Sequence, residues 1–279
     1  MSGEDSRIRS KGTSKFSDNA LVPQADVLVC EEPLEIQIAG RRWVTVMRTP
    51  GDDFNLAKGL LFGEGIIANA RDIQSIRHCS TVPTPEAEEN ILQIRLDESI
   101  HMDWNAQERH LFANASCGVC GKASLENLSK DLGPMPVNWR ADLTSLAQMP
   151  EQMRKAQDIF ESTGGLHAAA LFSKDGDCIK VCEDIGRHNA TDKVIGWGLS
   201  HDLSFADSIL VVSGRISFEI AQKAWKAAVP ILVAVSAASS LAVEVAEEAN
   251  MGLMSFTRQG SGNCFGALQR FETTGGTSS

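Results

Sequence analysis

The chain has 279 residues, and its 26 basic and 36 acidic side chains leave a formal net charge of −10. Hydrophobic residues make up 43% and charged residues 22%, which is typical of a globular protein and excludes a chain that is mostly disordered. The acidic balance also argues against a general nucleic-acid binder, because such proteins need a basic surface.

The N-terminal residues 1–24 are predicted to form a disordered polar tail. Residues 1–19 are polar and hold no apolar segment of the kind that a secretory signal requires. The most apolar stretches, residues 209–212 and 231–235, are far too short to span a bilayer. We therefore expect a cytoplasmic protein with no membrane association. At the other end, the Thr/Gly/Ser-rich residues 272–279 are expected to fray.

Residues 25–135 are predicted to form a small N-terminal α+β domain. Alternating apolar residues indicate strands, a turn at Gly40 joins the first two, and the acidic pair Asp52 and Asp53 marks the start of a helix. The expected elements are strands at residues 34–38 and 43–47, a helix that ends near residue 64, and strands at 76–82 and 91–96. A loop that carries Cys117 and Cys120 lies near the end of this domain.

Residues 136–271 are predicted to form a larger α/β domain. The expected elements are a helix at 150–162, a hairpin of strands 166–172 and 178–183, and then helices and strands in turn at 189–199, 208–213, 217–228, 231–236, 241–250 and 253–256. Apolar strands separated by helices indicate a largely parallel sheet with helices on its faces. Ligands bind at the carboxyl ends of such strands, which places the loops 214–215, 237–240 and 258–263 on one rim.

The cysteines suggest reactive thiols. There are seven, an odd number that cannot pair completely, and the motif Cys117-Gly118-Val119-Cys120 is the sharpest feature of the chain. This spacing suits a thiol–disulfide pair, half of a zinc site, or a sulfur carrier that holds sulfur as a persulfide. Two structural thiols that happen to be close are the remaining interpretation. Cys178 and Cys182 could complete a zinc site only if they were closer than the roughly 13 Å that a strand puts between them.

Three further motifs border the predicted strands. The run Glu183-Asp184-Ile185-Gly186-Arg187-His188-Asn189 is either a rim loop that meets an anionic ligand or a helix start capped by Asp184 or Asn189. Ser213-Gly214-Arg215 is either an anion-binding junction or an ordinary turn between a strand and a helix. The run Phe256-Thr257-Arg258-Gln259-Gly260-Ser261 offers an aromatic ring, a guanidinium and a glycine to a nucleotide, or is a glycine-rich exit loop.

One zinc chemistry is disfavoured directly. Zinc deaminases use His-x-Glu followed by Pro-Cys-x-x-Cys. Here Ala169 stands where the glutamate would follow His167, and no Pro-Cys-x-x-Cys comes after it. Deaminase chemistry is therefore not expected, although a related architecture is compatible with the pattern.

Taken together, the motifs resemble the formate dehydrogenase accessory sulfurtransferases (FdhD type), in the order of that family and over roughly residues 25–271. The matching stretches are Glu31-Glu32-Pro33-Leu34-Glu35-Ile36, Met47-Arg48-Thr49-Pro50-Gly51-Asp52-Asp53, Gly63-Glu64-Gly65-Ile66-Ile67, Ser116-Cys117-Gly118-Val119-Cys120-Gly121, Thr163-Gly164-Gly165-Leu166-His167, Glu183 to Ala190, Ser213-Gly214-Arg215, Ala234 to Ala238 and Leu241 to Ala246.

The resemblance implies a specific function. Proteins of this kind accept sulfur from a cysteine desulfurase as a cysteine persulfide and pass it to the molybdenum or tungsten of bis(molybdopterin guanine dinucleotide), which is then inserted into formate dehydrogenase. By this resemblance Cys117 carries the persulfide, Cys120 is its partner, and no permanently bound metal is expected. Arg258, Arg187 and Arg215 are candidate partners for the nucleotide phosphates.

The resemblance also implies a cytidine-deaminase-like three-layer α/β domain with a mixed sheet, and a homodimer. It places the cofactor-binding loop at residues 256–261, where Thr257 and Gln259 replace the cysteine and proline that the family usually has. Two other functions stay open at this point. One is a chaperone that binds the cofactor without transferring sulfur, and the other is a thiol–disulfide oxidoreductase.

Overall fold

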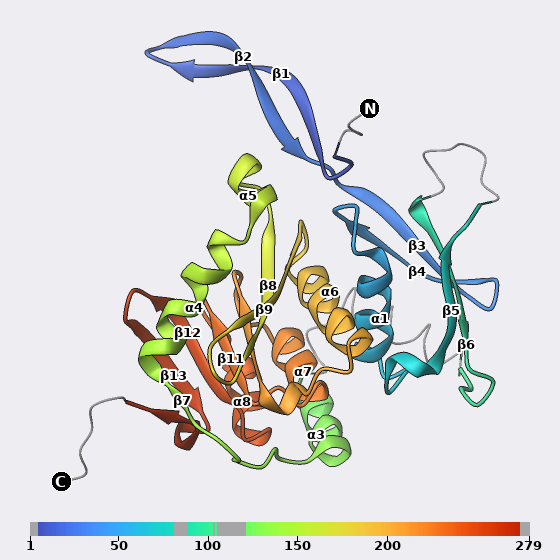
Figure 1. Cartoon of the computed structure of the whole chain (residues 1–279), viewed down its shortest axis with the longest axis vertical. Helices are drawn as coiled ribbons and strands as arrows, with labels where there is room; N and C mark the ends of the chain where they lie inside the picture. Colours follow the sequence, from blue (N-terminus) through green and yellow to red (C-terminus); the bar gives the residue numbers. More distant parts are fainter. Residues whose placement is uncertain (1–4, 81–88, 103, 105–120, 274–279) are drawn as a thin grey trace.

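A computed structural model describes residues 5–80, 89–102, 104 and 121–273, which form two packed domains and a projecting arm (Figure 1). The small domain is a four-stranded sheet in the order β4-β3-β6-β5. Its elements are β3 (Glu32–Ile38), β4 (Arg41–Arg48), α1 (Asp53–Gly63), η1 (Ala70–Asp72), β5 (Ile73–His78) and β6 (Ile91–Leu96). The predicted elements are present, although β5 begins and ends earlier than expected.

The larger domain is built on a six-stranded sheet in the order β13-β12-β11-β10-β8-β9. Its strands are β8 (His167–Ser173), β9 (Cys178–Asp184), β10 (Ser208–Val212), β11 (Ile231–Ala234), β12 (Gly252–Arg258) and β13 (Ser261–Gly266). The neighbours β10, β11 and β12 run parallel, and the other pairs are antiparallel. The mixed sheet implied by the resemblance is thereby confirmed. The largely parallel sheet expected from the strand pattern is wrong, because the β8–β9 hairpin and β13 add antiparallel strands at both edges, and the predicted exit loop is in part β13.

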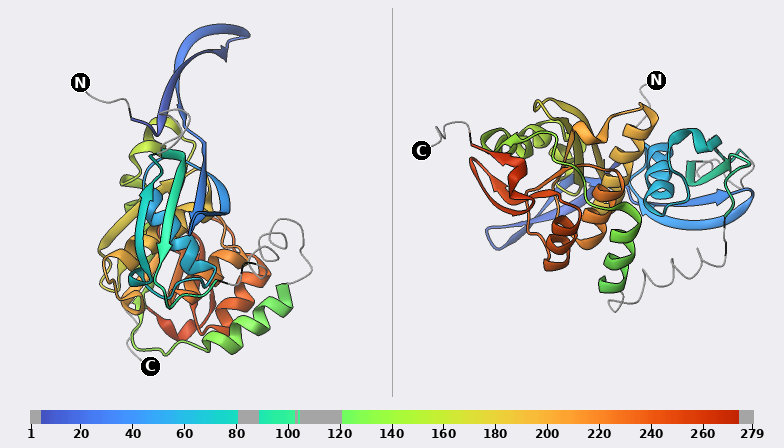
Figure 2. Two further views of the ribbon diagram at one scale, coloured as in Figure 1. Left: turned by 90° about the vertical axis from the view of Figure 1, so that its right-hand side faces the viewer. Right: turned by 90° about the horizontal axis from the view of Figure 1, so that it is seen from below.

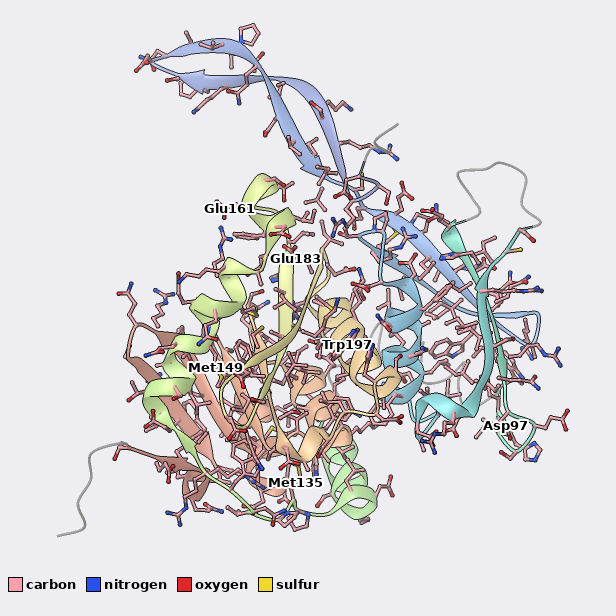
Figure 3. All side chains as sticks on the ribbon, in the orientation of Figure 1. Asp97, Met135, Met149, Glu161, Glu183 and Trp197 are labelled. Carbon is pink, nitrogen blue, oxygen red and sulfur yellow. The ribbon has the colours of Figure 1, made fainter. Side chains whose placement is uncertain are left out.

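Helices cover both faces of this sheet. They are α3 (Gly121–Leu132), α4 (Leu143–Lys155), α5 (Asp158–Thr163), α6 (Arg187–Ser200), α7 (Phe218–Lys226) and α8 (Ser240–Glu248), with short turns η3 (Phe205–Asp207) and η4 (Leu268–Arg270). Alternate residues of each strand serve opposite faces: Ile209 and Val211 pack toward α4, whereas Leu210 and Val212 pack toward the face of α6, α7 and α8. Figure 3 shows Met149 on α4, which is buried together with Ile209 and Val211 on the α4 side of the sheet. No helix in the described ranges is long and apolar enough to cross a membrane.

Two predicted boundaries in the middle of the chain are wrong. The single helix expected at 150–162 is two helices, and Pro150 lies inside α4 rather than at its start, because Asp142 caps the helix by accepting a hydrogen bond from Ser145. Helix α3, assigned by sequence to the small domain, packs Leu125 and Leu128 into the core of the larger domain. A two-residue pair of β7 (Ala141–Asp142) with β14 (Phe271–Glu272) then brings the end of the chain beside this connector.

The predicted disordered tail is largely a β-hairpin. Strands β1 (Ile8–Ser17) and β2 (Ala20–Val29) pair along their whole length and project from the body (Figure 1 and the left view of Figure 2). Asp18 and Asn19 both have positive φ, 51° and 61°, as a tight two-residue hairpin turn requires. The prediction failed because β1 is rich in serine, threonine, lysine and arginine, and such a polar composition is typical of disordered segments.

The two domains meet through the close approach of two helices. Gly59 of α1 lies against the backbone of Asp192 in α6, and Gly196 of α6 lies against the backbone of Asn55 and Gly59 (Figure 1). A Cβ atom at either glycine would overlap backbone atoms that have no room to yield. The absence of a side chain at both positions therefore sets the spacing of the domains.

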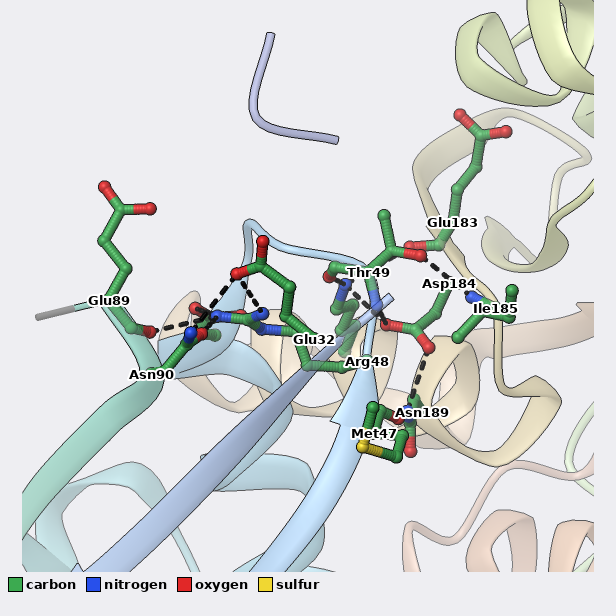
Figure 4. A network of polar contacts seen from close by, with 12 residues as sticks. Glu32, Met47, Arg48, Thr49, Glu89, Asn90, Glu183, Asp184, Ile185 and Asn189 are labelled. Atoms are coloured by element: carbon green, nitrogen blue, oxygen red, sulfur yellow. Dashed lines mark hydrogen bonds and ion pairs between the residues drawn. The ribbon is translucent and has the colours of Figure 1, made fainter. Parts of the chain in front are cut away.

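A buried polar network locks the same junction (Figure 4). Asp184, at the end of β9, is fully buried and forms an ion pair of 2.8 Å with Lys193 of α6. The Asp184 carboxylate also accepts hydrogen bonds from the backbone of Thr49 and Gly186 and from the side chain of Asn189. Lys193 and Asn189 donate in turn to the carbonyls of Thr49 and Met47. The larger domain thus holds the end of β4 by its backbone.

We predict that Gly196→Ala destabilises the protein by about 1–3 kcal/mol through overpacking, although alanine is the better helix former. Urea unfolding measures the change. Gly12→Ala in β1 is the control, because a Cβ there meets nothing within 4 Å. An equally stable Gly196→Ala protein would show that the helices can separate without loss.

We predict that Asp184→Asn costs about 3–5 kcal/mol, because it leaves the Lys193 ammonium buried without a counter-ion. Adding Lys193→Met should restore part of the loss, which a double-mutant cycle in urea would measure. As a control, Lys155→Met breaks an exposed pair with Glu151 and should cost no more than about 0.5 kcal/mol. If Asp184→Asn lowers the free energy of unfolding by no more than the control does, the Asp184 network does not hold the domains together.

Candidate functional site

The loops that the sequence places on one rim do lie together. The parallel strands β10, β11 and β12 end side by side, and the antiparallel β8 begins at the same edge, where Ser213 exchanges hydrogen bonds of 2.9 Å with the backbone of Ala168. Helices α6, α7 and α8 start from this edge. We call the segments 163–167, 184–188, 213–217, 236–240 and 256–261 the rim. The first peptide N–H groups of α6, α7 and α8 point to this edge and favour the binding of an anion.

The predicted cofactor-binding loop forms the turn between β12 and β13. The pairing shifts between Ser255 and Arg258, and Phe256 adopts φ of 50°, which is rare for a bulky residue. Its N–H donates to the carbonyl of Ser236 at the end of β11 over 3.0 Å. This conformation leaves the Phe256 ring 48% exposed on the rim and buries Thr257. Strain of this kind persists where the surrounding contacts fix it, and it is frequent at functional sites.

The remaining residues of this loop face solvent. Arg258, Gln259, Gly260 and Ser261 are exposed, and Gly260 takes φ of 82° to close the turn. Ser261 donates through Oγ to the carbonyl of Arg258 over 3.0 Å. The aromatic ring and the guanidinium are therefore available to a ligand, whereas the Thr257 hydroxyl is turned inward to the carbonyl of Met254.

The polar run 183–189 divides into structural and rim residues. Asp184 and Asn189 belong to the buried polar network between the domains. Neither side chain caps α6, whose N-cap residue is Gly186. Glu183, seen below α5 in Figure 3, accepts hydrogen bonds from the backbone N–H groups of Ile159 and Phe160 at the start of that helix. Only Arg187 and His188 turn toward α7 and the loop at Gly214.

Cationic groups gather at this part of the rim. The side chain of Arg187 and the ring of His167 both pack against Gly214. Burial lowers the pKa of His167, and the positive charges of Arg187 and His188 lower it further. His188 contacts Ser217 at 3.2 Å and Glu219 at 3.5 Å, and its hydrogen bond holds the pKa of Glu219 at about 2.

Cys117 and Cys120 lie outside the described residues, so their roles stay predictions. The structure does describe the other five cysteines, and no disulfide joins any two of them: Cys30, Cys79, Cys178, Cys182 and Cys264. Desolvation raises the pKa of Cys182 to about 12 and also raises that of Cys178 and Cys264. Since the thiolate is the nucleophile, these three thiols are poorly suited to sulfur chemistry at neutral pH.

Sequence reasoning missed one structural residue beside the site and one residue of the rim. Lys193 escaped notice because it stands in an otherwise apolar segment of α6, although the pair Asp192-Lys193 beside Val194 and Ile195 was a signal of buried charge. His167 was weighed only as a deaminase ligand. His167 and Arg187 both approach Gly214, and no local sequence pattern connects these residues.

Comparison with known proteins agrees with this architecture. Residues 29–272 match the model of the FdhD/NarQ family. A sulfur carrier protein FdhD of Streptomyces coelicolor is 43% identical over 263 residues, covering 92% of this chain and 93% of its own. One from Mycolicibacterium paratuberculosis is 46% identical over 253 residues, covering 89% and 93%.

A solved structure shares the fold. The crystal structure of a protein from Desulfotalea psychrophila, provisionally described as a formate dehydrogenase accessory protein, superimposes with a TM-score of 0.74 at 19% identity and covers 95% of this chain and 99% of its own. The match of the family model over most of the chain, together with relatives above 40% identity, settles the classification. This chain belongs to the FdhD/NarQ family.

Proposed function

We propose that this protein is a sulfur carrier in the maturation of formate dehydrogenase. The observation that carries the proposal is the Cys117-Gly118-Val119-Cys120 motif in a chain that is more than 40% identical, over about nine-tenths of its length, to proteins named sulfur carriers. The sulfur donor is a cysteine desulfurase, and the acceptor is the molybdenum of bis(molybdopterin guanine dinucleotide), which is a substrate here. Sulfuration precedes insertion of the cofactor into formate dehydrogenase.

Loading is a thiol exchange. The Cys117 thiolate attacks the terminal sulfur of the donor's persulfide, a sulfur–sulfur bond forms on Cys117, and the donor leaves as a thiolate. No net oxidation occurs.

Delivery has two balanced routes. In one, the Cys120 thiolate attacks Cys117, hydrosulfide leaves toward the metal, and the resulting Cys117–Cys120 disulfide needs a thiol reductant before the next cycle. In the other, Cys120 takes over the terminal sulfur as a second persulfide and acts as a further carrier.

The rim is the proposed cofactor site. The exposed Phe256 ring suits stacking on guanine, and the solvent-facing Arg258 supplies charge to the nucleotide. The cytidine-deaminase-like architecture is part of the proposal, supported by the sheet order and by the antiparallel β8–β9 hairpin that precedes three parallel strands. A cytoplasmic homodimer is proposed as well, and the arm's exposed Phe16 and Leu21 support contact with a second copy.

Two other functions are distinguished by their products. A chaperone that only shields the cofactor would bind guanine nucleotide but take up no sulfur. A thiol–disulfide oxidoreductase would turn over a disulfide substrate such as insulin without any requirement for the nucleotide.

We predict that Cys117→Ala abolishes uptake of sulfur from a cysteine desulfurase supplied with cysteine. Mass spectrometry of the intact chain and of its peptides detects the added sulfur atom. Cys178→Ala is the matched control, because Cys178 is exposed but its pKa is raised, and it should load normally. Sulfur found on the Cys117→Ala protein contradicts the assignment.

We predict that Phe256→Ala and Arg258→Ala each weaken binding of guanosine diphosphate in calorimetry. Loss of stacking on a base is worth about 1–3 kcal/mol, or roughly 5- to 150-fold in affinity. Phe16→Ala removes a ring that is 70% exposed on the arm and should leave the affinity unchanged. Equal affinities in all proteins would exclude the turn between β12 and β13 from the site.

A further inference from the structure

Arg187 is a half-buried cation without a counter-ion among the described residues. It enters no ion pair there, and its Nε–H is shielded from water yet has no hydrogen-bond partner. A donor in that state costs about 1–3 kcal/mol, which native proteins tolerate where a ligand or water supplies the missing partner. Arg187 stands at the first turn of α6, directly on the rim.

The neighbouring carboxylates are already engaged. Asp184, three residues earlier, is occupied by Lys193, Asn189 and two backbone N–H groups. Glu219 is held by His188 and Ser217. Neither is free to neutralise Arg187.

The surroundings of Arg187 favour an incoming anion. His167 reaches the same place from the start of β8, with Nδ1 3.5 Å from Ser213 Oγ. Burial lowers its pKa most, and repulsion by the positive charges of Arg187 and His188 lowers the pKa further. Gly214 lies between them, and a Cβ there would sit 3.4 Å from both side chains. An anion would relieve this repulsion, and a guanidinium matches two oxygens of a phosphate group.

We propose that Arg187, with His167 and the backbone at Gly214, holds the diphosphate of the guanine nucleotide. This inference rests on the proposed function. The sheet order supports it: Arg187 packs against Gly214, which follows β10, and β10 lies two strand spacings, or about 10 Å, from β12, so a nucleotide can place its base at Phe256 and extend its phosphates toward Arg187. Arg215 and Arg258 are exposed, and because solvent screens their charges they are weaker partners than Arg187.

Calorimetric titration of the full-length protein with guanosine diphosphate, guanosine and inorganic pyrophosphate tests the assignment. Charge-assisted hydrogen bonds are worth about 1.5–3 kcal/mol, so Arg187→Gln should lower the affinity for guanosine diphosphate roughly 10- to 150-fold. The affinity for guanosine should stay unchanged, and binding of pyrophosphate should fall below detection. Arg140→Gln is the charge-matched control, because Arg140 is exposed beside β7, near the start of β12 and away from the rim.

A second variant keeps the inference testable if the first one does not fold. If Arg187→Gln fails to fold, as judged by circular dichroism, His167→Ala should still weaken guanosine diphosphate without affecting guanosine. Unchanged guanosine diphosphate affinity in a folded Arg187→Gln protein overturns the inference, and the proposed function survives if Phe256→Ala weakens binding or Cys117 still loads sulfur. An altered alkylation rate of Cys117 with unchanged diphosphate affinity would assign Arg187 to the thiol and overturn the inference as well.

Discussion

The buried carboxylate of Asp184 is the interaction on which the arrangement of this molecule depends. Burying an isolated carboxylate is costly, and it is tolerated here because Lys193 neutralises it and several N–H groups bind its oxygens. Some of those donors come from the segment that follows β4 of the small domain, and others come from α6 of the larger one. The same group therefore fixes the contact between the domains and the exit of the chain from β9. Arg187 and His188 follow directly, so the fixed end of β9 also positions these two residues at the start of α6.

Net charge and local charge have different consequences in this protein. The formal charge of −10 repels polyanions in general, whereas the proposed ligand is itself an anionic nucleotide. Binding must then rest on short-range groups in a partly desolvated place, where each interaction is stronger than in open water. The rim provides them as a guanidinium, imidazole rings and the first peptide N–H groups of three helices.

The sequence predicts most of the larger domain because its buried strands are short, continuous apolar runs with helices between them. It fails where the deciding contact is distant or the composition misleads. Pro150 looks like a helix start, but the cap at Asp142 and the packing of Leu146 and Met153 on the sheet extend the helix on both sides of it. The N-terminal hairpin is predicted to be disordered because β1 is mostly polar, whereas the apolar residues of its partner β2 lie largely on the surface and bury little core, and only Asp18-Asn19 gives a turn signal.

The candidate site was predictable in part. Residue type and position at strand ends indicate the rim and the exposed turn at Phe256, yet they cannot show that Thr257 is turned inward. They also cannot separate Asp184, which is structural, from Arg187 three residues later. That distinction depends on Thr49 and Gly214, which lie far away in sequence and close in space.

In the proposed function, the chain delivers sulfur rather than merely sheltering the cofactor. The most direct measurement loads the protein with a defined amount of persulfide, removes the donor, and adds it with unsulfurated cofactor and thiol reductant to inactive formate dehydrogenase. Activity should then rise in proportion to the persulfide supplied, and labelled sulfur should appear in the enzyme's cofactor. Equal activation by protein that carries no persulfide would contradict the claim.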